Sequence, residues 1–231
     1  MNPTASRLQE IQERIVAAAA RAGREGAAVQ LVAVAKTATA ETLQEAWSAG
    51  HRQFGHNRVQ ALEAHRLTLP EAEWHLLGPL QGRKVRRGLQ ASSLYQALGE
   101  TKTLERMERA LEETQVDRYP ALIQVNPNPE DGRYGCTPAD LDALVDATLA
   151  CERVQLQGLM TLAQAEAEDS ALRRHFSLIH DRFAALQAEG RLPQDALLSM
   201  GMSQDFETAV EEGANLVRVG RAIFPPDPET T

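Results

Sequence analysis

The sequence contains few of the residues that mark secreted, membrane-spanning or metal-binding proteins. Its 231 residues include only two cysteines, Cys136 and Cys151, whose separation is not typical of a metal site. Two cysteines in a chain this long are typical of free thiols in a reducing compartment. No run of about 18 apolar residues is present, and the first residues lack the charged-then-apolar pattern of a signal peptide. We therefore expect a cytoplasmic protein that spans no membrane.

Positive charge is also scarce. The chain carries 24 Lys and Arg against 32 Asp and Glu, which gives a net charge of −8. A phosphate backbone binds a basic face, so this balance argues against non-specific binding of nucleic acid. The six histidines show no ligand spacing, and the motifs His-Glu-x-x-His and Cys-x-x-Cys are both missing. We therefore expect no metal site.

Short apolar runs that alternate with amphipathic stripes dominate the sequence. Eight runs are expected to be strands, at residues 31–36, 53–57, 74–78, 93–98, 121–125, 154–160, 196–200 and 216–220. Eight strands alternating with helices over about 230 residues are typical of an α/β fold, the (β/α)₈ TIM barrel. A doubly wound open sheet is the alternative, but it usually has fewer strands.

No linker or composition shift divides the chain, so residues 1–231 are expected to form a single domain. An extra helix is expected before the first strand, because Leu8, Ile11 and Ile15 share one helical face. The last helix of the barrel is expected to be short or missing. The N-terminal helix should therefore cover that part of the barrel wall.

Lys36 follows the uninterrupted apolar run Leu31–Ala35, at the expected carboxyl end of the first strand. In barrels and open α/β sheets that end carries the chemistry, because the loops converge there. An amine held at the mouth of an apolar barrel is partly desolvated, which favours the nucleophilic form that a Schiff base requires. A lysine that merely extends into water is the commoner case, so Lys36 alone is weak evidence.

Two strand ends near the C-terminus have features of a phosphate site. The segment Ser199–Ser203 joins the seventh strand to its helix, and Ser203 is expected to cap that helix beside free backbone amides. Gly220 and Arg221 end the eighth strand, where a glycine permits close approach of a ligand to the backbone. Loops after strands seven and eight often bind phosphate in this barrel. An ordinary cap at Ser203 and an ordinary turn at Gly220 are equally compatible with the sequence.

Arg218 lies inside the eighth strand, where a buried charge requires a partner. An inward guanidinium could reach a ligand ring near Lys36, whereas an outward one would form a salt bridge. Asn57 and Asn126 follow strands and could line the mouth, although structural turns are the commoner role for such residues.

Six segments, in chain order, resemble the pyridoxal phosphate homeostasis protein family: 33–37, 54–60, 74–81, 158–161, 198–206 and 217–224. The resemblance covers nearly the whole chain. It implies a barrel of the alanine racemase N-terminal type, with pyridoxal 5′-phosphate (PLP) held as a Schiff base on Lys36. The sequence departs from the family pattern at His56, where glutamate is usual, at Gln81–Lys84, and at Arg221, where a small residue is common.

The resemblance also implies which residues contact PLP, all of them at or near strand ends: Lys36, Asn57, Ser199, Met200, Ser203, Arg218, Gly220 and Arg221. Arg218 would face the pyridine nitrogen and Asn57 would lie near the ring. Either Ser199 or Ser203 would contact the phosphate, together with the backbone amides of Gly220 and Arg221.

The function implied is a non-catalytic, monomeric PLP carrier or regulator that passes PLP to apo PLP-dependent enzymes. An arginine beside the pyridine nitrogen disfavours its protonation and weakens PLP as an electron sink. Racemases that resemble this barrel take a tyrosine from a second domain, which is not seen before Thr231, and only Tyr134 is expected near the mouth. Two alternatives remain: a small PLP-dependent racemase or decarboxylase that uses Lys36 and Tyr134, and a Schiff-base aldolase that uses Lys36 without a cofactor.

Overall fold

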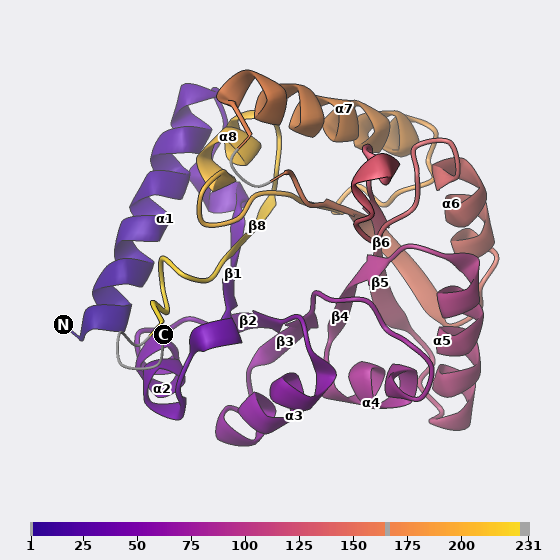
Figure 1. The fold of residues 1–231 in the computed structure, drawn as a ribbon, viewed down its shortest axis with the longest axis horizontal. Coiled ribbons are helices and arrows are strands. Elements are labelled where there is room, and N and C mark those ends of the chain that lie inside the picture. The colour runs from indigo at the N-terminus through magenta and orange to yellow at the C-terminus, as the bar shows by residue number, and fades with distance from the viewer. Residues whose placement is uncertain (1, 165–166, 227–231) are drawn as a thin grey trace.

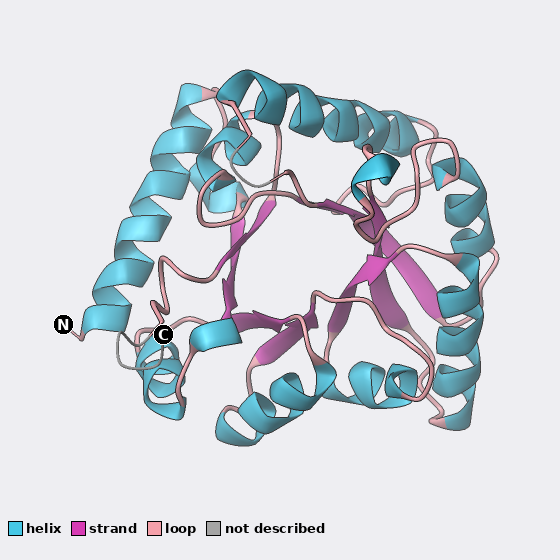
Figure 2. Ribbon diagram, in the orientation of Figure 1, coloured by secondary structure: helices cyan, strands magenta, loops and turns pink. Residues whose placement is uncertain are grey.

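The computed structural model describes residues 2–164 and 167–226. Eight parallel strands close into a barrel in chain order, and Figure 2 shows them as an inner ring. The strands are β1 (Gln30–Val34), β2 (Gln53–His56), β3 (Glu73–Leu76), β4 (Leu94–Leu98), β5 (Tyr119–Val125), β6 (Val154–Thr161), β7 (Leu197–Ser199) and β8 (Leu216–Val219). Pairing between β1 and β8, with Val32 opposite Arg218, closes the ring. The predicted (β/α)₈ barrel is confirmed.

The helices form an outer layer around the strands (Figure 1). They are α1 (Pro3–Arg21), α2 (Ala40–Ser48), α3 (Val59–Thr68), α4 (Lys84–Ala91), α5 (Thr101–Glu113), α6 (Leu141–Leu149), α7 (Asp169–Ala188) and α8 (Phe206–Glu211). Short 3₁₀ turns lie at Gly26–Ala28, Ala35–Thr37 and Pro129–Asp131. Strands enclosed in this way have no solvent face, which explains why β4 and β8 are buried along their whole length. None of the described helices is long and apolar enough to cross a membrane.

Helix α1 covers the wall beside β1 and β8, where α8 is only six residues long and no helix follows β8 within the described residues. The side chain of Asn2 begins the helix by accepting a hydrogen bond from the Ala5 amide at 2.7 Å. Leu8, Ile11 and Ile15 are buried on its inner face, and α1 packs against α8 and α2. The prediction that the N-terminal helix replaces part of the outer layer is therefore confirmed.

Two predicted boundaries differ from the structure near the carboxyl end of the barrel. Strand β1 ends at Val34, so Lys36 lies in the following 3₁₀ turn rather than on the strand. Helix α8 begins at Phe206, and its N-cap residue is Asp205. The prediction that Ser203 caps this helix is wrong, because the Asp205 carboxylate accepts a hydrogen bond from the Met202 amide at 2.5 Å and closes a turn before the helix begins.

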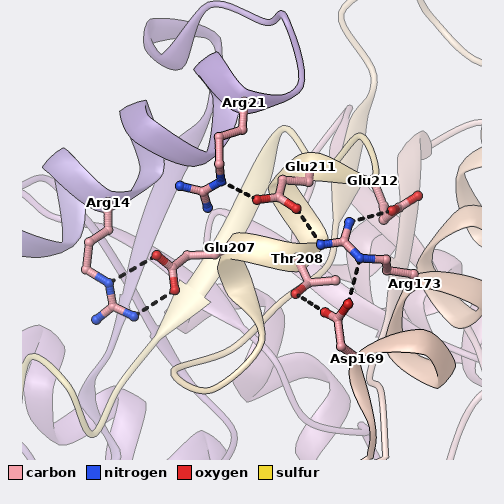
Figure 3. A network of polar contacts seen from close by, with 8 residues as sticks. All are labelled: Arg14, Arg21, Asp169, Arg173, Glu207, Thr208, Glu211 and Glu212. Atoms are coloured by element: carbon pink, nitrogen blue, oxygen red, sulfur yellow. Dashed lines mark hydrogen bonds and ion pairs between the residues drawn. The ribbon is translucent and has the colours of Figure 1, made fainter.

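Ion pairs hold the short helix α8 between α1 and α7 (Figure 3). They join Arg14 to Glu207, Arg21 to Glu211, and Arg173 to Asp169, Glu211 and Glu212, while Thr208 donates to Asp169. Single pairs of this kind contribute little, but a network with shared partners contributes more. The network therefore fixes α8, and with it the loop that connects β7 to α8, relative to the outer layer.

Candidate functional site

A cavity of about 650 Å³ opens at the carboxyl end of the barrel, between the ends of β1, β2, β7 and β8. Six of the eight residues predicted to contact PLP line it: Lys36, Asn57, Ser203, Arg218, Gly220 and Arg221. Ser199 and Met200 do not line the cavity and are fully buried behind it. The structure thus brings together an amine, a guanidinium and two loops that lie far apart in the sequence.

Lys36 reaches the cavity because the chain turns immediately after β1. Ala35 is fully buried and anchors this turn, whereas Lys36 is exposed to the cavity. The Thr37 hydroxyl donates to the Phe224 carbonyl at 2.5 Å, which joins the turn to the loop that follows β8. The backbone that carries the Lys36 amine is therefore fixed beside Gly220 and Arg221, which follow β8.

The loops after β7 and β8 meet across the cavity. The Gly220 amide donates to Ser203 Oγ at 3.2 Å. Among the described residues, the backbone amides of Ser203, Gln204, Arg221 and Ala222 donate no hydrogen bond to another group. Ser203, Gln204 and Arg221 line the cavity, and free amides from two loops can bind an anion there, because each presents a partial positive charge.

Gly201 sets the shape of the β7 loop. Its φ of +90° is strained for other residues, and a Cβ there would lie 2.7 Å from the Phe206 Cα atom. Gly220 has a different role, because a Cβ there would lie 3.1 Å from the Val34 carbonyl oxygen. Gly220 therefore allows β8 to pack closely on the end of β1.

Arg218 points into the barrel and not outward to a salt bridge. The residue is only 3% exposed. Its guanidinium donates to Ser199 Oγ and, at 2.8 Å, to the Thr161 carbonyl. Burial lowers the pKa of Arg218 to about 10, and the negative charge of Asp205 opposes this shift. The guanidinium stays protonated at neutral pH and forms a cationic wall of the cavity.

The Ser199 hydroxyl is hydrogen-bonded inside the barrel. Its hydroxyl donates to Gln96 Oε1 at 2.7 Å, and Gln96 Nε2 donates to His75 Nδ1 at 2.9 Å. Sequence reasoning missed Gln96 and His75, although each is a polar residue in the middle of an apolar run. Of the two candidate serines, only Ser203 reaches the cavity.

Asp205 is a third residue that sequence reasoning missed. It lines the cavity, and burial raises the pKa of its carboxyl group. One of its oxygens is held by the Met202 amide, so the carboxylate shapes the β7 loop. No sequence signal pointed to it, because it was expected inside the helix that Ser203 would cap.

Asn57 reaches the cavity from the end of β2, next to a buried histidine. Gly78 packs directly on the Asn57 carbonyl, which a Cβ at Gly78 would approach to 2.1 Å. His56 accepts a hydrogen bond from the Arg58 amide at 2.9 Å through Nδ1. Burial, with nearby His65, lowers the pKa of His56 to about 4, so this departure from the family pattern places a neutral imidazole beside the mouth.

Two other candidates for the mouth of the barrel, Tyr134 and Asn126, have structural roles. Tyr134 packs its ring on Gly99 and is not among the residues that line the cavity. Asn126 closes the turn after β5, where it accepts from the Asn128 amide at 3.0 Å and donates to the Arg133 carbonyl at 2.9 Å. The turn interpretation of Asn126 agrees with this geometry.

Buried neutral histidines make stability depend on pH. Burial lowers the pKa values of His56, His75 and His175 to about 4, whereas an unfolded histidine titrates near 6.5. Between these values the unfolded chain binds more protons, so stability falls as the pH falls from about 6.5 toward 4. We expect the urea midpoint to drop from pH 7.5 to pH 5, and to drop less in a His56→Gln variant. A urea midpoint that stays constant between pH 7.5 and pH 5 would contradict these lowered histidine pKa values.

Comparison with known proteins places the chain in a family. Residues 6–228 match the family described as alanine racemase, N-terminal domain. The pyridoxal phosphate homeostasis protein of Pseudomonas aeruginosa is 35% identical over 229 residues, which cover 97% of this chain and 96% of the relative. The Escherichia coli protein of the same name is 34% identical over 239 residues, with 97% of each chain covered. The chain belongs to the pyridoxal phosphate homeostasis protein family.

Solved structures agree with this membership. PipY of Synechococcus elongatus, solved with PLP bound, superimposes with a TM-score of 0.83 at 32% identity and covers 96% of this chain and 99% of PipY. An alanine racemase from Streptomyces lavendulae has a TM-score of 0.75 at 20% identity, over 96% of this chain and 59% of the racemase. The second likeness concerns the fold alone. The predicted family and the alanine racemase-like barrel are both confirmed.

Proposed function

We propose that this chain binds PLP in the cavity, joined to Lys36 as a Schiff base, and acts in PLP homeostasis without turning over a substrate. One observation carries the proposal: a single cavity collects an amine, two loops with free amides and a buried guanidinium. These groups complement the aldehyde, the phosphate and the pyridine nitrogen of PLP. The family of the chain and the PLP-bound structure of PipY support the same conclusion.

The residues present fit the phosphate of PLP. Ser203 Oγ already accepts the Gly220 amide, so its own hydrogen can be donated to a phosphate oxygen. The Arg221 amide and its exposed side chain add positive charge at the mouth. This arrangement suits an anion better than a neutral ligand.

The residues present also fit the aldehyde and the ring. Lys36 supplies the amine, and Leu77 and Leu162 supply an apolar wall. Arg218 can donate to a pyridine nitrogen but cannot accept a proton from it, so the ring nitrogen is kept unprotonated. When bound, PLP can delocalise electrons from an amino-acid carbon, and an unprotonated ring does this poorly.

The absence of turnover is supported by the groups near Lys36. Catalysis on amino acids requires a second positioned acid or base. Among the described residues that line the cavity there is no tyrosine, histidine or cysteine, and Tyr134 lies at Gly99 instead. Asp205 is the acidic residue in the wall, and it is tied to the Met202 amide.

The loaded protein is therefore expected to hand over PLP and not to transform amino acids. We expect activation of an apo PLP-dependent enzyme when it is mixed with the holo-protein. In parallel, incubation with single amino acids in deuterium oxide should show no repeated exchange of the α-proton. Multiple turnovers that are lost in Lys36→Ala would instead establish the small racemase. Aldol cleavage of a sugar phosphate by a colourless preparation would establish the aldolase.

We also propose that residues 1–231 act as one domain and as a monomer in the cytoplasm. Among the described residues, the large apolar side chains that are exposed lie on separate elements: Val16 on α1, Leu67 on α3, Leu149 on α6, Leu178 on α7 and Met202 in the loop after β7. Scattered exposure of this kind is normal for a monomer. Cys136 and Cys151 are both free, as expected for a protein of a reducing compartment.

A further inference from the structure

A chain of buried polar side chains crosses the barrel from β8 to β3. It runs from Arg218 through Ser199 and Gln96 to His75. These residues are 3%, 0%, 0% and 4% exposed, respectively, so bulk water cannot replace a lost partner. An unmade hydrogen bond at this depth therefore carries the full desolvation cost.

The direction of each hydrogen bond in this chain is fixed by chemistry. A guanidinium can only donate, so Ser199 Oγ must accept from Arg218. The single hydroxyl hydrogen of Ser199 is then donated to Gln96 Oε1 at 2.7 Å. The Gln96 amide must in turn direct its NH₂ group at His75 Nδ1, at 2.9 Å. His75 completes the chain as a neutral acceptor, in agreement with the lowering of its pKa to about 4 by burial.

This chain controls where the Arg218 guanidinium points. The two acceptors of Arg218 are the Thr161 carbonyl, which the backbone of β6 fixes, and the Ser199 hydroxyl, which can rotate. Gln96 removes that freedom by accepting the hydroxyl hydrogen, and His75 holds Gln96 in the required orientation. No carboxylate bonds to the guanidinium in the described structure, so these neutral groups determine its plane.

We propose that Gln96 and His75 are positioning residues. They orient Arg218, through Ser199, so that it donates to the pyridine nitrogen of PLP. The proposal rests on the function proposed above and extends the PLP site by two residues that do not touch the cavity. It predicts that their loss weakens one contact with PLP, the contact at the ring nitrogen, and leaves the contacts with the aldehyde and the phosphate in place.

A pair of ligands isolates that contact. PLP and its 1-deaza analogue share the aldehyde and the phosphate, but the analogue has a C–H group in place of the ring nitrogen. The ratio of their affinities therefore reports the Arg218 contact alone. We expect the wild-type protein to prefer PLP by about tenfold or more, the size typical of a hydrogen bond from a charged donor.

The variants are chosen to separate positioning from general damage to the barrel. Gln96→Met keeps the side-chain length and removes both hydrogen bonds, so the ratio should fall toward one. Gln124→Met is the matched control, because Gln124 is also a buried glutamine but donates to the Tyr134 carbonyl outside this chain, at 2.7 Å. The control should keep the wild-type ratio. At position 75, His75→Asn retains an acceptor and should keep the wild-type ratio of affinities. His75→Leu removes the acceptor, so its ratio should fall toward one.

Each outcome supports or contradicts the positioning role of Gln96 and His75. An unchanged ratio in Gln96→Met and His75→Leu would overturn the positioning role, and so would an equal fall in Gln124→Met. If Gln96→Met does not fold, the two His75 variants decide by the same ratio. Failure of the wild-type protein to bind either ligand would overturn the proposed function itself. Tight binding of PLP with no preference over the analogue would overturn only this inference.

Discussion

Replacement of Lys36 by alanine is expected to remove covalent PLP and to lower the affinity for PLP by at least about 100-fold, or roughly 2.8 kcal/mol. Lys36 presents the amine that lines the cavity between Asn57 and the β8 loop. Without this amine the phosphate and ring contacts remain, but the binding of PLP becomes non-covalent. Equilibrium dialysis of the apo-protein against PLP measures the change, and the visible absorption of the purified variant reports the loss of the Schiff base.

The chain supplies its own controls for this experiment. Its lysines occur at only three positions, residues 36, 84 and 102. Lys84 begins α4 and Lys102 lies in the first turn of α5, and neither lines the cavity. Lys84→Ala and Lys102→Ala should therefore bind PLP like the wild-type protein. A Lys36→Ala protein that stays yellow and binds with unchanged affinity would show that another amine carries the cofactor.

Replacement of Ser203 by alanine should weaken PLP binding selectively. The hydroxyl is held by the Gly220 amide and can donate to a phosphate oxygen. Loss of a hydrogen bond to an anion costs about 1.5–3 kcal/mol, which is roughly a tenfold loss of affinity or more. Arg221→Gln should also lower the affinity for PLP, because it removes a positive charge beside the phosphate. Titration followed by absorbance measures both effects.

Pyridoxal, which lacks the phosphate, is the matched control ligand for the Ser203 variant. Its affinity should be almost unchanged in Ser203→Ala, because the hydroxyl has no anion to contact. Ser199→Ala offers a second contrast, since Ser199 lies behind the cavity and serves Arg218. That variant should weaken PLP and pyridoxal alike. Equal losses for both ligands in Ser203→Ala would remove Ser203 from the phosphate site.

The barrel could be predicted from the sequence because local patterns determine it. Short apolar runs between amphipathic stripes occur in the right number and order, and strand closure follows from that rhythm. The position of Lys36 at the cavity could be predicted for the same reason, since Lys36 closely follows the first buried run. The direction of Arg218 could not, because alternation along a strand allows either face. Only the closed barrel and the acceptors at Ser199 and Thr161 determine that it points inward.

Contacts between distant residues limited the prediction of the site. Ser199 and Gln96 are 103 residues apart, and nothing local in either segment signals their hydrogen bond. The sequence therefore could not show that, of the two serines, only Ser203 lines the cavity. The cap of α8 was misassigned for a local reason, because both Ser203 and Asp205 are good capping residues and Asp205 is closer to the helix. Tyr134 was expected near the mouth; its ring packs on Gly99, just after β4, and Tyr134 is not among the residues that line the cavity.

The most direct test of the central claim is borohydride reduction of the purified holo-protein, followed by peptide mapping. Reduction converts a Schiff base into a stable secondary amine and leaves a pyridoxyl group on the lysine that held PLP. With lysines at only three positions, the three peptides are easily distinguished. The structure predicts a yellow protein that is bleached by borohydride, with the label on the peptide that contains Lys36. Label on Lys84 or Lys102, or no label on a protein saturated with PLP, would contradict the account.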